Sequence, residues 1–60
     1  MTAREIVKKL EAHGWVFDRK TGSHLIYVKE GCRSIPVPFH SNRDLGLLGK
    51  RILKEAKINN

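Results

Sequence analysis

The chain has 60 residues, which allows a single domain over 1–60 with a small core, because a chain this short buries only about 60% of the surface its unfolded form exposes. Its 12 Lys and Arg residues outnumber its 6 Asp and Glu residues, and the net charge of +6 favours a polyanion such as nucleic acid as the partner. This size excludes an enzyme with a large cleft, and the single cysteine, Cys32, excludes a small secreted scaffold held together by internal disulfides.

The sequence also argues against a membrane segment. No run of about 18 apolar residues occurs, and the N-terminal stretch has a helical period with Glu5 in it, where a signal peptide would show a continuous apolar region. We therefore expect a cytoplasmic protein with no membrane partner.

A first helix is predicted from about Ala3 to His13. Thr2 and Glu5 have the spacing of a capping box, in which the hydroxyl and the carboxylate each pair with a free backbone N–H at the helix start. Gly14 is expected to end the helix, because glycine adopts the left-handed conformation of a C-terminal cap at no steric cost.

After Gly14 the apolar pattern changes to that of strands. Trp15–Phe17 is a short β-prone run, Lys20–Gly22 has the composition of a turn, and His24–Val28 is a second run of branched and aromatic residues. Glu30 and Gly31 are predicted to form the next turn.

A third strand is predicted over Arg33–Phe39. Pro36 and Pro38 have no N–H, and residues two apart direct their N–H groups to the same side, so this strand must lie at an edge of the sheet. A meander with the third strand outside meets that requirement using short hairpins only. The positions expected on one face are Ile35, Val37 and Phe39.

A last helix is predicted to begin near Arg43, with Ser41 or Asn42 as its N-cap. Gly46 and Gly49 weaken its first turns, so regular helix is also compatible with a start near Leu47. The expected packing stripe consists of Leu45, Leu48, Ile52, Leu53 and Ala56.

The predicted fold class is therefore α+β, in the order α-β-β-β-α. Two helices cover one face of a three-stranded antiparallel sheet, and the other face is left free to meet a ligand.

Histidine is the side chain best suited to move protons near neutral pH, and the chain has His13, His24 and His40. His24 follows Gly22 and Ser23, so a phosphate can approach the backbone closely and a hydroxyl lies beside the imidazole. On spacing alone, the short Gly-Ser-His motif favours an ordinary exposed histidine on a strand, and the role of His40, which follows the third strand, is ambiguous.

Metal binding is the weaker alternative for these residues. His24, Cys32 and His40 could converge across a small sheet, but the paired spacings typical of zinc sites are missing. The chain also lacks the fingerprints of phosphate-binding loops and dinucleotide sites. We expect no metal and no small-molecule cofactor.

Basic residues are expected near the strand ends around His24, where they could hold an RNA backbone. Arg19 and Lys20 lead into the Gly22–His24 turn, and Lys29, Arg33 and Arg43 follow or precede other strands. A second group, on the last helix, is as compatible with an ordinary solvated helix face as with binding; it comprises Lys50, Arg51, Lys54 and Lys57.

Taken in order along nearly the whole chain, these motifs resemble the HicA family of toxins, the mRNA interferases of HicA/HicB type II toxin–antitoxin systems. The matching positions are Gly14-Trp15, Arg19, Gly22-Ser23-His24, Ile26-Tyr27, Val37-Pro38-Phe39-His40 and Ile52-Leu53-Lys54. Gly46–Gly49 and Lys57 depart from the family pattern at the entry and exit of the last helix, away from His24.

The resemblance implies a double-stranded-RNA-binding-domain-like fold, cleavage of mRNA with His24 as the catalytic residue, and a HicB-like antitoxin as the protein partner. RNA carries its own nucleophile, the 2′-hydroxyl, so a metal-independent endoribonuclease needs only a proton-transfer group and nearby cations. Gly22 and Ser23 would position phosphate, and Arg19 or Lys20 would stabilise charge.

Two other functions remain open at this point. One is a non-catalytic RNA-binding module, since this element order with basic loops suits recognition of A-form RNA by shape. The other is a pure interaction protein whose open sheet face serves a protein partner.

Overall fold

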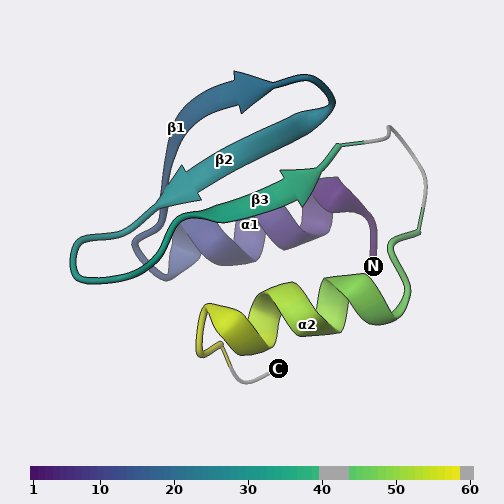
Figure 1. Cartoon of the computed structure of the whole chain (residues 1–60). Coiled ribbons are helices and arrows are strands. Elements are labelled where there is room, and N and C mark those ends of the chain that lie inside the picture. The colour runs from purple at the N-terminus through teal and green to yellow at the C-terminus, as the bar shows by residue number, and fades with distance from the viewer. Residues whose placement is uncertain (40–43, 59–60) are drawn as a thin grey trace.

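A computed structural model describes residues 1–39 and 44–58 of the chain. Its elements occur in the predicted α-β-β-β-α order (Figure 1). They are α1 (Ala3–Ala12), β1 (Val16–Thr21), β2 (His24–Val28), β3 (Ile35–Pro38) and α2 (Leu47–Glu55).

The sheet is an antiparallel meander with the strand order β1-β2-β3, as predicted. In β3 both prolines pair with β2 at their Cα positions, Pro36 with Ile26 and Pro38 with His24. The third strand thus occupies an edge, where a missing N–H costs no ladder hydrogen bond on the free side. Arg33, Ser34 and Phe39 lie outside β3, so the strand is shorter at both ends than the Arg33–Phe39 segment expected for it.

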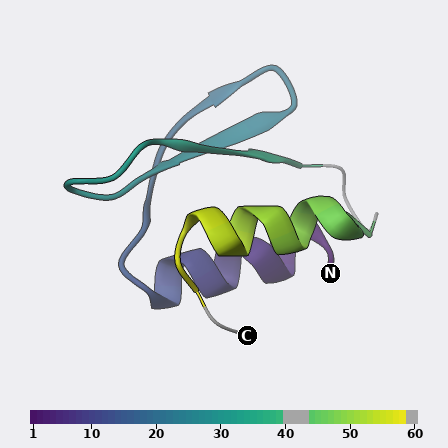
Figure 2. The same ribbon diagram turned by 60° about the horizontal axis from the view of Figure 1, so that its bottom comes forward.

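Both helices lie on the same side of the sheet, which confirms the predicted layering (Figure 2). They enclose one core with the inner faces of β2 and β3. Ile6, Leu10 and Val37 are its most deeply buried side chains, and each has 0% of its surface exposed. Burying such aliphatic side chains contributes roughly 1.5–3 kcal/mol each, which makes this core the main stabilising feature of so short a chain.

The first helix begins with the predicted capping box. The Thr2 N–H donates to Glu5 Oε1 at 2.9 Å, and the Glu5 N–H donates to Thr2 Oγ1 at 3.3 Å. The helix ends at Ala12 with His13 as its C-cap, and Gly14 follows with a φ of 90°. This left-handed conformation lets the chain reverse, and Trp15 enters the core with 2% of its surface exposed.

The predicted turn at Lys20–Gly22 is wrong, because β1 continues through Lys20 to Thr21. Pairing with β2 holds these polar residues in an extended conformation despite their low strand propensity, and a bulge at Asp18 interrupts the register. The turn consists of Gly22 and Ser23 alone. Gly22 has a φ of 58°, as the first position of the tightest hairpin turns requires.

Helix α2 begins at Leu47, in agreement with the later of the two predicted starts. The proposed caps Ser41 and Asn42, and the start near Arg43, lie outside the described residues. Ile52, Leu53 and Ala56 are buried as predicted, whereas Leu48 is wrong as a packing residue because 44% of its surface is exposed.

Gly49 is a point of close helix contact. A Cβ built on it would lie 3.4 Å from Ile6 Cδ1, so the absence of a side chain lets α1 and α2 approach. Within the described residues, neither helix is long and apolar enough to cross a membrane.

Asp44 and the start of the chain connect the two helices. Asp44 Oδ1 accepts from the Gly46 N–H at 2.7 Å and from the Met1 amino group at 3.0 Å, while the Leu45 N–H donates to the Met1 carbonyl at 2.7 Å. The Gly46 bond is the main reason that the pKa of Asp44 is lowered, and the bond from the Thr2 N–H likewise lowers the pKa of Glu5.

These two carboxylates predict a loss of stability in acid. The pKa values of both carboxylates are lower in the folded than in the unfolded chain. Their contribution to the free energy of unfolding is therefore present above the unfolded pKa values of about 4, and it is lost as the pH falls through the folded pKa values. The double variant Glu5→Gln/Asp44→Asn should therefore show a smaller shift in urea midpoint between pH 6 and pH 2.5 than the parent chain. Equal shifts for the two proteins would contradict this assignment.

Candidate functional site

His24 is fixed in position by pairing on both sides. It is the first residue of β2, opposite Thr21 of β1 and Pro38 of β3. Next to it, the Phe39 N–H donates to the Ser23 carbonyl at 2.8 Å, so the hairpin turn is tied to the end of β3 as well. The backbone of His24 is thus held by the sheet while its side chain is exposed.

The imidazole ring is available for chemistry. Among residues 1–39 and 44–58, no side chain or backbone group forms a hydrogen bond or ion pair with it. Gly22 leaves the approach to the turn open, since a Cβ added there would meet nothing within 4 Å. A ligand phosphate can therefore reach the backbone and the ring from the solvent side.

The strand register assigns the nearby basic residues to different faces. Leu25 packs against the core, so its partner Lys20 shares the inner face, and His24 lies on the outer face by the alternation of a strand. Arg19 pairs with Ile26, which puts Arg19 on the outer face with His24. Arg19 also forms an ion pair with Asp18 at the bulge. The structure thus places Arg19 on the same face of the sheet as His24, and Lys20 on the opposite face.

The inner face of the hairpin is organised around Tyr27. Its hydroxyl donates to Glu11 Oε2 of α1 at 3.4 Å, and the ring of Phe17 packs edge-on against it with centroids 5.9 Å apart. Burial raises the pKa of Tyr27, and the charge of Glu11 adds to the rise. This cluster connects β1 and β2 to α1 and leaves the outer face to His24.

Lys29 and Arg33 do not lie around His24, contrary to what the sequence suggested. Both belong to the segment between β2 and β3, at the end of β2 opposite His24. The rise of β2 from His24 to Val28 is about 13 Å, so Lys29 and Arg33 lie at least that far along the strand from His24. The Lys29 side chain extends over Gly14, where a built Cβ would lie 3.6 Å from Lys29 Cε. Arg33 lies beside a separate pocket.

The metal-site alternative does not assemble in the described residues. Cys32 lies in the β2–β3 connection, where its N–H donates to the Lys29 carbonyl, at the end of β2 opposite His24. No group of three His, Cys, Asp or Glu residues that could hold a metal ion occurs within residues 1–39 and 44–58. His40 and Arg43 lie outside the described residues.

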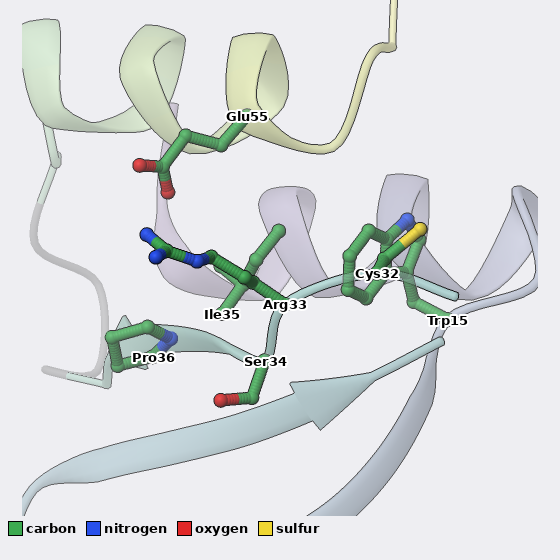
Figure 3. A pocket seen from close by; sticks show the side chains of 7 residues that line it. All are labelled: Trp15, Cys32, Arg33, Ser34, Ile35, Pro36 and Glu55. Atoms are coloured by element: carbon green, nitrogen blue, oxygen red, sulfur yellow. The ribbon is translucent and has the colours of Figure 1, made fainter. Parts of the chain in front are cut away.

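A pocket that no sequence pattern predicts lies between the start of β3 and α2 (Figure 3). Its volume is about 350 Å³. Trp15 and Ile35 supply apolar lining, and Arg33 and Glu55 extend toward one another from the loop and from α2. The two charged residues are 22 positions apart in the sequence and belong to different elements, so no local motif signals their approach.

Comparison with known protein families identifies a match along nearly the whole chain. The family model for the HicA toxin of bacterial toxin–antitoxin systems matches residues 3–58 of the chain. No curated protein and no solved structure matches the chain significantly.

The exposure of His24 predicts that its side chain contributes little to folding. We expect His24→Ala to change the free energy of unfolding by no more than about 0.5 kcal/mol, as is usual for surface positions. By contrast, Tyr27→Ala on the same strand should cost about 3 kcal/mol or more, because Tyr27 is 3% exposed and packs in the core. Urea unfolding of both variants tests this, and a large loss for His24→Ala would mean that the imidazole has a structural role.

Proposed function

The chain belongs to the HicA toxin family, and we propose that it is a metal-independent endoribonuclease that cleaves mRNA with His24 as the proton-transfer residue. Family membership makes it the toxin of a toxin–antitoxin system that pairs with an antitoxin. The observation that carries the catalytic proposal is the exposed imidazole of His24, which has no partner among the described residues and lies on a backbone held by both neighbouring strands.

The proposed reaction uses the nucleophile that RNA itself carries. The 2′-oxygen attacks the adjacent phosphorus, the bond from phosphorus to the 5′-oxygen breaks, and a 2′,3′-cyclic phosphate and a 5′-hydroxyl are left. His24 either accepts the proton of the 2′-hydroxyl or donates one to the departing 5′-oxygen, and water takes part in the other of these two proton transfers. A metal ion is not required for this route, because the attacking group needs only to lose a proton.

Charge stabilisation is assigned to residues on the outer face. Arg19 shares this face with His24, and its guanidinium is suited to the negative charge that develops on the phosphate oxygens. Gly22 and Ser23 would orient the same phosphate through the turn backbone and the hydroxyl. Lys20 would contact RNA from the inner side of β1.

Lys29 and Arg33 would act farther along the RNA. Their distance from His24 along β2 makes them candidates for contacts with neighbouring nucleotides, beyond the phosphate that is cleaved. Such an enzyme acts on mRNA in the cytoplasm, and a HicB-like antitoxin would inhibit it by covering His24. The basic charge of the toxin favours an acidic surface on that antitoxin.

His24→Ala should abolish growth arrest on expression and RNA cleavage by the purified protein. The variant should still bind RNA, because the basic residues remain, and wild-type cleavage should persist in the presence of a metal chelator. A non-catalytic RNA-binding module predicts instead that growth arrest survives the substitution. Continued cleavage by a folded His24→Ala protein would exclude the proposed role.

Charge-reversal variants distinguish a specific role of Arg19 in cleavage from a general electrostatic attraction of RNA to the protein. Arg19→Glu, Lys20→Glu and Lys54→Glu each change the net charge by the same amount, but only Arg19 shares a face with His24. We expect Arg19→Glu to lower the cleavage rate about tenfold or more, as the loss of a bond to a charged group does, and Lys54→Glu to have the smallest effect. Three equal reductions would mean that only net charge matters.

A further inference from the structure

The pocket between β3 and α2 has the form of a small ligand site. Its volume of about 350 Å³ falls at the low end of the range for such sites, which suits a single planar group. Trp15 and Ile35, each 2% exposed, form the buried floor of the pocket, and Pro36 is the exposed apolar residue of its lining. A flat ring that enters the pocket can therefore pack against Pro36 above this floor.

Two opposite charges flank this apolar lining. The guanidinium of Arg33 and the carboxylate of Glu55 point toward one another across the pocket (Figure 3). Neither forms an ion pair or hydrogen bond with any residue in the described part of the chain. The donors of Arg33 and the acceptors of Glu55 are thus both available to a group inserted between them.

The chemistry of these groups selects among the four bases of RNA. A guanidinium donates two parallel hydrogen bonds and is matched by two adjacent acceptors, which guanine offers at N7 and O6. A carboxylate accepts two, and guanine alone presents adjacent donors on two atoms, N1 and N2. Adenine, cytosine and uracil each lack at least one of these pairs.

The pocket is also within reach of an RNA bound at His24. Pro38 is the β3 partner of His24, and Ile35 and Pro36 line the pocket two to three residues earlier on the same strand, about 7–10 Å away. A strand of RNA that crosses β3 from the outer face can therefore place a base there while a phosphate near it lies at His24.

We propose that this pocket binds a guanine base of the RNA substrate, with Arg33 on N7 and O6 and Glu55 on N1 and N2. The inference rests on the proposed function, because it assigns a sequence preference to the same RNA. It changes the expected role of Arg33 from phosphate contact to base recognition. It also gives the acidic Glu55 a role in RNA binding, on a protein whose net positive charge otherwise suits a polyanion.

The test measures binding by the His24→Ala protein, so that cleavage does not interfere. Fluorescence anisotropy is recorded with short oligouridylates that carry one central guanosine, inosine, 7-deazaguanosine or uridine. Inosine lacks the N2 amino group that faces Glu55, and 7-deazaguanosine lacks the N7 acceptor that faces Arg33. We expect guanosine to bind about tenfold more tightly than uridine, and each analogue to lose most of that advantage.

Matched variants assign each contact. Glu55→Gln should lose discrimination between guanosine and inosine, and Arg33→Met should lose discrimination between guanosine and 7-deazaguanosine. The control variants Glu30→Gln and Arg4→Met make the same chemical changes at exposed sites outside the pocket and should keep both preferences.

Equal binding of all four oligonucleotides overturns the guanine assignment while leaving the proposed ribonuclease intact. Variants at Arg33 and Glu55 that weaken the pairing with the antitoxin and leave RNA preference unchanged overturn it in favour of a protein ligand. Failure of the parent protein to bind or cleave any RNA refutes the proposed function itself, and the pocket assignment with it.

Discussion

The central position of β2 is the constraint on which the rest of the structure depends. Because β2 is paired on both sides, the alternation of its side chains assigns Leu25 and Tyr27 to the core and His24 to the outer face. A shift of one residue in this register would bury the imidazole and expose the tyrosine. The two helices then close the inner face, so a chain of 60 residues has both a core and an exposed face that carries His24.

The features that were predicted correctly from the sequence depend only on residues that lie close together in the chain. The capping box at Thr2, the left-handed Gly14 and the edge placement of a strand with two prolines follow from properties of single residues or short spacings. The extent of β1 did not follow, because strand pairing with β2 overrides the weak strand propensity of Asp18, Arg19 and Lys20. The placement of Arg19 and Lys20 on opposite faces follows from strand alternation once β1 includes both residues, so it could not be read from composition.

The candidate site was predictable only in part, for related physical reasons. His24 and its turn are contiguous in sequence, so their proximity is guaranteed by covalent connection. Arg33 and Glu55 line one pocket only because α2 packs against β3, and no short motif encodes such packing. In the described residues nothing covers His24, and the toxin family pairs with an antitoxin, so an antitoxin that covers His24 would control the proposed ribonuclease.

The chemistry of the cleaved ends tests the central claim most directly, because it reports which oxygen attacked the phosphorus. If His24 assists the 2′-hydroxyl of the substrate, the purified protein should leave 2′,3′-cyclic phosphate and 5′-hydroxyl ends, and a single 2′-deoxy substitution at the cleaved position should block the reaction. Products with 5′-phosphate and 3′-hydroxyl ends, or cleavage of the 2′-deoxy substrate at the same position, would show that water is the nucleophile and would contradict this account.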